Sequence, residues 1–506
     1  MQSPPIITPA VRVAPSRQAI ASLAQFVLNA GYTEARMKAI GLTKTPWRES
    51  GARSLLSYKV PEDSTLGLLI RLFFFAEDVP VDVISSVFPT EITEIMLRSG
   101  MLQQEGDRLL PGCMLTHFEN LLLSCDSVRE ARTEVPSDLV LGVNIPTHIL
   151  ARCMLRLPDA GEVLDVGTGC GTLALHASSG ASRVFGTDIN PRALEFMLFN
   201  AALNGISNLE AFAGDRFQPV EGHRFDLILC NPPFFLGSKS KLVFTHNPFT
   251  LDSFIESLAR QAPAFLKECG YCQMLCEWVE LKGQPWHKRI HSWFRESGCD
   301  VLILKAYEIT PPDYVLKRAA EAASLYGEPS SESLLDQARY FEEHGVERIL
   351  GGLVTMRRST VWLDGKPRSR NWFIVDDMEE VPSAPIGHLL LERFSAEEIT
   401  NSNSDSRVLA AKPRLSKDVI LVEEAVQEGR SWKPKITYLE RRSGLPHRLG
   451  FEPHIAQVLA LWDGSRDLEF LIDAFAKQHN LRKNQITPDW LRLVRRLASL
   501  SFISFQ

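Results

Sequence analysis

A glycine-rich turn between a short apolar run and a helical pattern constrains the fold of this chain more than any other feature. Residues 162–166 form an apolar run with β-branched residues, as a buried parallel strand requires. Gly167, Gly169 and Gly171 follow at once, and residues 172–177 can open a helix. Glycines at such a junction let the backbone turn sharply and let a ligand approach where a Cβ would clash. The segment therefore predicts an α/β sheet that binds a ligand at the carboxyl end of this strand.

A second strand, residues 183–188, ends in an acid that indicates what the ligand contains. Asp188 stands 23 residues after Asp165 and can accept hydrogen bonds from both hydroxyls of a ribose. NAD enzymes carry such an acid too, so Asp188 alone does not decide the ligand. Asp165 favours S-adenosylmethionine (SAM), because a buried carboxylate needs a partner and the SAM ammonium or the loop amides would supply one. The glycine spacing G-x-G-x-G also differs from the dinucleotide pattern G-x-G-x-x-G.

The segment Asn231, Pro232, Pro233 and Phe234 follows a third apolar run at residues 225–230 and indicates the chemistry. Two prolines fix φ and remove backbone donors, which leaves carbonyl oxygens in a stiff turn. The Asn231 side chain and the Pro232 carbonyl can accept the two hydrogens of a planar amide or amino group, and Phe234 can stack on it. An Asn-Pro turn also ends strands in proteins without such chemistry. Its place in a glycine-loop domain favours an N-methyltransferase site that works by positioning and polarisation.

The stretch from about residue 144 to residue 310 resembles the class I SAM methyltransferases of the small-domain group. That group includes HemK-type glutamine methyltransferases and rRNA guanine-N2 methyltransferases. The positions that match are the loop 165–171, Asp188, Gly214 with Asp215, and the segment 231–234. The resemblance implies an α/β fold with a Rossmann-like, mostly parallel sheet whose last strand is antiparallel.

The resemblance also implies roles for individual residues. Gly167 and Gly169 would pack against the methionine part of SAM, Asp188 would hold the ribose, Asp215 would bond the adenine amino group, and Asn231 would orient the target nitrogen. HemK-type enzymes usually carry Tyr at the last position of the proline motif, where this chain has Phe, so the substrate class stays open. The predicted cofactor-binding residues are Asp165, Gly167, Thr168, Gly169, Gly171, Asp188, Ile189, Asp215, Arg216 and Asn231, and the predicted catalytic residues are Asn231, Pro232, Pro233 and Phe234.

With 506 residues the chain is too long for one core. We predict an N-terminal helical, winged-helix-like domain at 1–143, a methyltransferase domain at 144–383 and a C-terminal accessory domain, small α/β or helical, at 384–506. The N-terminal part shows helical patterns, followed by a strand–turn–strand pattern at 100–111. The expected helices are 66–76, 81–88 and 90–99 in the N-terminal part and 455–461, 468–475 and 488–500 in the C-terminal part.

Composition limits the class of protein. Hydrophobic residues make up 45% of the chain and charged residues 23%, as in an ordinary globular protein, and the net charge is −6. The longest apolar run, 66–76, is too short to span a bilayer, and no secretion signal is evident, so a cytoplasmic protein without membrane contact is expected. Nine cysteines are scattered along the chain, and Cys269, Cys272 and Cys276 fall in a strand pattern, so neither disulfides nor a metal site is expected.

Several hypotheses remain for the function. The first is methyl transfer from SAM to a protein glutamine, and the second is transfer to an exocyclic amine of a base in rRNA or tRNA. The acidic net charge favours protein slightly, although small basic clusters such as Lys433 with Lys435 leave nucleic-acid contact through the accessory domains open. A scaffold without activity is disfavoured because Asp165, Asp188 and Asn231 are all present. An NAD-dependent oxidoreductase is disfavoured by the glycine spacing.

Overall fold

The computed structural model divides into two compact units, Met1–Leu150 with Leu157–Asp376, and Ala151–Arg156 with Asp377–Gln506. The three-domain division that the sequence predicts stays a prediction. The residues that the structure describes are 15–42, 58–126, 137–157, 160–232, 236–237, 250–326, 330–359, 362–363, 366–367, 371–378, 380–401, 404–441, 447–450, 455 and 458–506.

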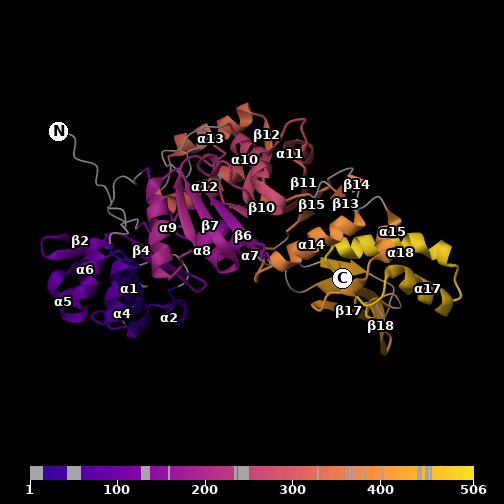
Figure 1. Ribbon diagram of the computed structural model, residues 1–506, viewed down its shortest axis with the longest axis horizontal. Coiled ribbons are helices and arrows are strands. Elements are labelled where there is room, and N and C mark those ends of the chain that lie inside the picture. The colour runs from indigo at the N-terminus through magenta and orange to yellow at the C-terminus, as the bar shows by residue number, and fades with distance from the viewer. Residues whose placement is uncertain are drawn as a thin grey trace. The chain divides into compact units, whose positions relative to one another are not determined.

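An eight-stranded sheet in the order β15-β11-β12-β10-β9-β6-β7-β8 forms the centre of the first unit (Figure 1). Strands β6 to β10 that are neighbours pair in parallel, whereas β12 runs antiparallel to both β10 and β11. The predicted α/β sheet, mostly parallel with an antiparallel strand, is confirmed; the edge strand β15 was not predicted. The strands are β6 (Ala160–Val166), β7 (Ala181–Asp188), β8 (Leu209–Ala213), β9 (Phe225–Cys230), β10 (Leu266–Leu281), β11 (Cys299–Ile309), β12 (Val346–Arg358) and β15 (Phe373–Asp377).

Helices pack against this sheet and bury its central strands. In β9 the successive residues Leu227, Ile228, Leu229 and Cys230 are all buried, because the two faces of the strand are both covered. Ile228 and Cys230 share a core with residues of α10 and α11. The helices that contact the sheet include α8 (Thr172–Ala177), α9 (Pro191–Leu203), α10 (Ser253–Gln261) and α11 (Trp286–Trp293).

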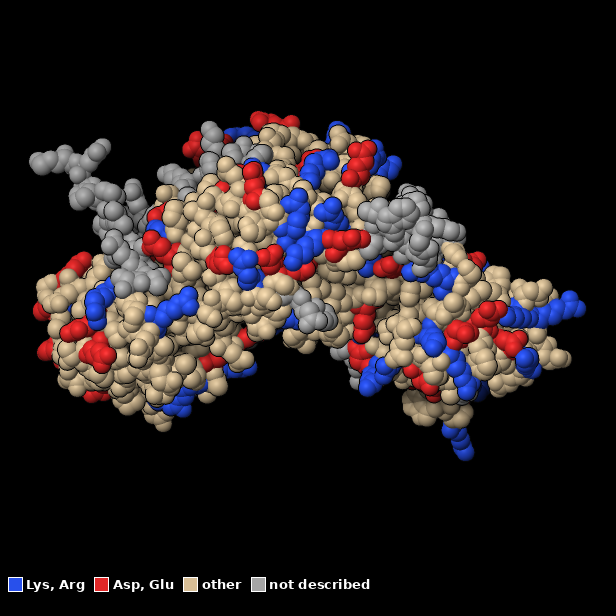
Figure 2. All heavy atoms as spheres, in the orientation of Figure 1, with Lys and Arg blue, Asp and Glu red and all other residues tan. Residues whose placement is uncertain are grey.

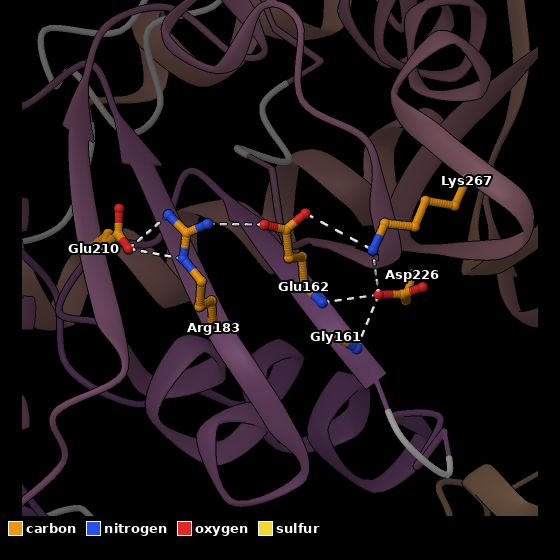
Figure 3. Close-up of polar contacts among 6 residues, drawn as sticks. All are labelled: Gly161, Glu162, Arg183, Glu210, Asp226 and Lys267. Carbon is orange, nitrogen blue, oxygen red and sulfur yellow. Dashed lines mark hydrogen bonds and ion pairs between the residues drawn. The ribbon is translucent and has the colours of Figure 1, made fainter.

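A chain of ion pairs joins the amino ends of five strands (Figure 3). Arg183 of β7 bonds Glu210 of β8 at 2.8 Å and Glu162 of β6 at 3.0 Å. Lys267 of β10 lies 2.9 Å from Asp226 of β9 and 3.8 Å from Glu162. The Asp226 carboxylate also accepts two backbone N–H groups of β6. This network ties the strands together at the edge opposite the glycine loop.

The N-terminal part of the first unit contains five described helices and two small sheets. The helices predicted at 66–76, 81–88 and 90–99 are confirmed as α4, α5 and α6, and the predicted strand–turn–strand pattern is confirmed as β2 and β3, with Gly106 at φ +61° in the turn. Strand β1 completes a β1-β3-β2 sheet. The winged-helix assignment stays a prediction. The elements are α1 (Arg17–Asn29), α2 (Glu34–Ala39), α4 (Thr65–Phe73), α5 (Val81–Val87), α6 (Thr90–Arg98), β1 (Val79–Pro80), β2 (Leu102–Glu105), β3 (Arg108–Pro111), β4 (Met114–Phe118) and β5 (Leu121–Cys125).

The β4–β5 hairpin, which the sequence did not predict, docks onto helix α9. Asn200 lies in the last turn of α9, and Asn204 is the C-cap residue that follows this helix. The Asn200 side chain accepts the N–H of Ser124 at 2.7 Å and donates to its carbonyl at 2.9 Å. Asn204 bonds both backbone groups of Leu122 in the same way, at 3.0 and 2.8 Å. The two side-chain amides thus form the hydrogen bonds that a neighbouring strand would form with β5. Apolar residues of α9 also share one core with α1, α4 and α6.

Helices α12 (Pro311–Tyr326) and α13 (Ser331–Glu343) lie in the chain between β11 and β12 and form a cap. Tyr314 and Phe341 from these helices pack in one apolar core with Leu236, which follows the proline motif in the sequence. Glu277 of β10 is buried and bonds the guanidinium of Arg318 and the hydroxyl of Tyr314, at 2.8 and 2.7 Å. The cap is therefore anchored both to the sheet and to the segment that follows Asn231.

The second unit combines helices with two small antiparallel sheets. Helix α17 confirms the helix predicted at 468–475. The helix predicted from Pro488 begins at Lys483 instead, because buried Leu491 and Val494 hold a helix that continues through the proline. The sequence did not predict β17 and β18, whose residues are mostly exposed and therefore lack a clear apolar alternation. The elements are α14 (Gly387–Thr400), α15 (Asp405–Ala410), α17 (Leu468–Gln478), α18 (Lys483–Ser499), β16 (Pro413–Leu415), β17 (Val419–Glu428), β18 (Ser431–Arg441), β19 (His447–Gly450) and β20 (Ile503–Phe505).

Residues 456–457, near the start of the helix predicted at 455–461, lie outside the described residues, so that helix stays a prediction. Within the described part of the chain, no helix is both long enough and apolar enough to cross a membrane.

Candidate active site

The glycine loop lies at the carboxyl end of β6, and the surroundings of Gly171 differ from those of Gly167 and Gly169. All three have φ in the left-handed region, +69° for Gly167, +56° for Gly169 and +88° for Gly171. A Cβ on Gly167 or Gly169 would meet nothing within 4 Å, whereas a Cβ on Gly171 would lie 2.5 Å from Cγ of Met197 in α9. The first two glycines therefore turn bare backbone toward open space, and the third lets α8 and α9 pack closely.

Asp165 ties this loop to the helix that follows it. Its carboxylate is 1% exposed and accepts the hydroxyl of Thr168 at 2.7 Å and the N–H of Ala174 at 3.1 Å. Burial raises the pKa of Asp165 to about 7, with a smaller contribution from the charge of Asp188, although the two hydrogen bonds act in the opposite direction. The partners of this buried acid are thus a hydroxyl and an amide of its own segment.

Asp188 ends β7 and faces the glycine loop. One carboxylate oxygen accepts the N–H of Gly169 at 2.9 Å, and the other accepts the N–H of Asn190 at 2.9 Å. Burial raises the pKa of Asp188, and the two amides offset part of that effect. The next residue, Ile189, is 62% exposed, which is unusual for a large aliphatic side chain. An acid can accept hydrogen bonds from ribose hydroxyls, and an exposed apolar side chain beside it can pack against the base of a nucleoside.

Asp215 follows β8 and stands beside Arg216. The guanidinium of Arg216 donates twice to one Asp215 oxygen, at 2.9 and 2.7 Å, and also bonds Ser257 of α10 at 2.8 Å. Arg216 adopts φ +50°, and its carbonyl accepts the hydroxyl of Thr187 at 3.0 Å. The side chain of Asp215 stays 47% exposed and is held in place by its neighbour. Arg216 therefore fixes the position of the Asp215 carboxylate.

Asn231 follows β9, the strand next to β6, so Asn231 and the glycine loop lie at neighbouring strand ends where the strand order reverses. Its Nδ2 donates to Oγ1 of Thr147 at 3.2 Å. Its Oδ1 is buried and has no hydrogen-bond partner among the described residues. Pro232 is buried. Pro233 and Phe234 lie outside the described residues, so their predicted roles stay predictions.

Two residues near Asn231 were not predicted as site residues. Thr147 lies in α7 (Ile145–Cys153), and Asn144 precedes that helix. Both the N–H and the hydroxyl of Thr147 bond Oδ1 of Asn144, at 2.9 and 2.8 Å. An asparagine immediately before a helix is a favoured N-cap residue and signals a helix start. However, no sequence pattern shows that this helix start meets a strand end 84 residues later.

The residues at this sheet edge fit SAM. The open space in front of Gly167 and Gly169 admits a ligand chain, Asp188 can hold a ribose, and Ile189 offers an apolar surface to a base. The buried Oδ1 of Asn231, which has no hydrogen-bond partner among the described residues, can accept a further N–H group. The strand order and the position of the site are those of an α/β domain with the class I methyltransferase fold.

Comparison with known proteins names the family. Residues 141–294 match the methyltransferase small domain family, so this part of the chain is a class I SAM-dependent methyltransferase domain whose methyl donor is SAM. The release factor glutamine methyltransferase of Vibrio cholerae is 35% identical over 127 residues, 22% of this chain and 43% of the relative. The ribosomal protein L11 methyltransferase of Lactobacillus johnsonii is 44% identical over 92 residues, 18% of this chain and 29% of the relative.

A protein of Methanocaldococcus jannaschii, provisionally named as a protein N5-glutamine methyltransferase, is 33% identical over 121 residues, 22% of this chain and 60% of that protein. The chain thus spans less than two thirds of the length of these relatives. The crystal structure of a ribosomal protein L11 methylase from Lactobacillus delbrueckii subsp. bulgaricus is 24% identical over 32% of this chain and 72% of that one, with a TM-score of 0.24, which is too low to add to the argument.

Proposed function

We propose that this protein transfers the methyl group of SAM to a planar nitrogen of a macromolecule, and that a glutamine side chain of a protein is the first candidate. The observation that carries the proposal is the buried, unpartnered Oδ1 of Asn231 at the carboxyl end of β9. A buried acceptor of this kind costs about 1–3 kcal/mol while it is unpaired, so a partner from the substrate is favoured.

Cofactor binding is assigned to the sheet edge around β6 and β7. The backbone of Gly167 and Gly169 would take the methionine part, Asp188 the ribose and Ile189 the base, with Asp215 at the adenine amino group. SAM supplies a methyl group on a sulfonium, which is already a good electrophile. The chain therefore needs to bind and orient rather than to create a strong base.

Catalysis would rest on the two acceptors that follow β9. Oδ1 of Asn231 and the carbonyl of Pro232 would each accept one N–H of the target group, which turns the nitrogen lone pair toward the methyl carbon. The nitrogen forms the new N–C bond as the C–S bond breaks toward sulfur, and one N–H proton leaves to water. Phe234 would stack on the planar group.

Two observations favour protein over RNA as the substrate. The relatives at 33–44% identity carry the names of protein glutamine and ribosomal protein methyltransferases. On the face drawn in Figure 2, lysine and arginine side chains lie interspersed with acidic ones, whereas binding to RNA favours a continuous basic surface. A nucleobase amine is the alternative substrate.

The test uses radiolabelled SAM and a lysate from cells that lack the protein. Wild-type protein should transfer label to a species that protease removes and ribonuclease leaves intact. Asn231→Ala should bind SAM with nearly unchanged affinity in calorimetry but transfer label at least a hundredfold more slowly. Label that ribonuclease removes would replace glutamine by a nucleobase as the target, and full turnover by Asn231→Ala would refute the assigned role.

A further inference from the structure

We propose that Thr147 is a positioning residue that holds the side-chain amide of Asn231 with its oxygen toward the methyl-accepting nitrogen. The inference rests on the proposed function, and it names a residue outside the glycine loop and the proline motif. A chain of three side chains, Asn144, Thr147 and Asn231, carries it. Each link in the chain fixes the direction of the next.

The direction is set first at Asn144. The backbone N–H of Thr147 lies 2.9 Å from one terminal atom of the Asn144 side chain. A backbone N–H can only donate, so this atom has to be the amide oxygen and not the amide nitrogen. The bond is an ordinary helix cap at the start of α7, and it leaves no freedom to reverse the Asn144 amide.

The hydroxyl of Thr147 is oriented next. Its Oγ1 lies 2.8 Å from the same Asn144 oxygen, which can only accept. The single hydroxyl proton of Thr147 therefore points to Asn144. Only the lone pairs of Oγ1 are left to bond a second residue, so toward that residue the hydroxyl can act only as an acceptor.

Asn231 is oriented last. Its amide lies 3.2 Å from Oγ1 of Thr147. Since that hydroxyl can only accept here, the atom that faces it has to be Nδ2, and the reversed amide would set two oxygens against each other. Oδ1 of Asn231 therefore points away from Thr147, where it is buried without a partner among the described residues. The arrangement keeps this oxygen ready for a substrate N–H.

The side chain that transmits this order is itself held firmly. Thr147 is 8% exposed, and a β-branched side chain in a helix has few allowed rotamers. Asn144, by contrast, is exposed, so its substitution disturbs little packing. These properties allow the chain of bonds to be broken at either end by small changes.

The first test compares Thr147→Val with Thr147→Ser in the full-length protein. Valine keeps the shape of threonine and keeps the backbone N–H that bonds Asn144, so the helix cap survives and only the hydroxyl is lost. We expect kcat for methyl transfer to fall about tenfold or more, as for loss of one oriented hydrogen bond, while the Kd for SAM stays unchanged. Thr147→Ser should restore most of the rate. Wild-type turnover by Thr147→Val would overturn the proposal.

Coupling to Asn231 separates positioning from a general structural defect. If Thr147 acts only through Asn231, Thr147→Val should cause no further loss of kcat in an Asn231→Ala background, whereas independent effects would multiply. Asn144→Ala, which frees the hydroxyl proton, should lower kcat in the same direction, and Asn144→Asp, which keeps an acceptor, should not. These variants keep the proposal testable if the valine protein does not fold.

A crystal structure of the Thr147→Val protein provides a readout independent of turnover. The Asn231 amide should be rotated or disordered in the variant and ordered in the wild type, and an amide that is ordered in the same orientation in both proteins would overturn the proposal. Failure of the wild type to methylate any substrate would instead refute the proposed function, and the crystal comparison would still decide the inference about Thr147.

Discussion

Two glycines in one loop, Gly169 and Gly171, should respond to alanine in opposite ways. Both occupy the left-handed region, at φ +56° and +88°, so alanine pays a similar backbone cost of about 1–2 kcal/mol at either position. Replacing glycine by alanine also lowers the conformational entropy of the unfolded chain by the same amount at both positions. What differs is the space around the new methyl group, which is open at Gly169 and filled at Gly171.

The magnitude follows from the contacts at Gly171. Its added Cβ would lie 2.5 Å from Cγ of Met197 and 2.7 Å from Cδ1 of Leu175, so α8 or α9 has to shift. Overpacking of this kind costs about 1–3 kcal/mol. Because the backbone terms cancel, Gly171→Ala should be less stable than Gly169→Ala by about that amount.

Affinity for SAM should show the reverse order. In Gly169→Ala the methyl group projects into the space that the cofactor chain is proposed to fill, so the Kd for SAM should rise at least tenfold, about 1.4 kcal/mol. Urea unfolding measures the stability of both variants, and calorimetry measures SAM binding. Equal loss of stability in the two variants, or wild-type SAM affinity in Gly169→Ala, would refute the division of work between the glycines.

Three further predictions concern the acids and the asparagines. Asp188→Ala should weaken SAM binding itself, and an unchanged Kd in calorimetry would remove the ribose assignment. Burial raises the pKa of Asp165 to about 7, so its contribution to folding is fully present below about pH 4 and is lost as pH rises through about 7. Over this range the free energy of unfolding of the wild type, measured with urea, should fall relative to that of Asp165→Asn, and a constant difference would contradict the prediction. Asn200→Ala strands both buried backbone groups of Ser124 and should lower the free energy of unfolding by about 2–5 kcal/mol, more than Asn204→Ala at a half-buried site, and an equal loss would count against the reasoning.

Sequence patterns predicted the elements whose apolar residues recur with a clear period. Strand β9 and strand β6, which precedes the glycine loop, are buried on both faces, and each is recognisable in the sequence as a short apolar run. Helix α17, expected at 468–475, also has such a pattern and is observed at Leu468–Gln478. The exposed β17–β18 hairpin has no such pattern, so its strands went unpredicted. The start of α18 was misplaced because Pro488 was taken for a helix start.

The candidate site was predicted where motifs are local and missed where they depend on the fold. The glycine loop, Asp188 and Asn231 stand next to strand ends that the sequence makes recognisable. Thr147 acquires its importance only because α7 begins beside the end of β9, which is a tertiary contact. Such a residue is recognised only in the structure, where Thr147 bonds Nδ2 of Asn231 and the Oδ1 of the same amide has no partner among the described residues.

The bond between hairpin β4–β5 and helix α9 has a consequence for anyone who wants the catalytic sheet alone. Deleting the chain up to residue 126 would remove the hairpin partners of the Asn200 and Asn204 amides and expose the apolar side of α9 to water. We expect a chain shortened in this way to aggregate, because a large exposed apolar patch promotes association.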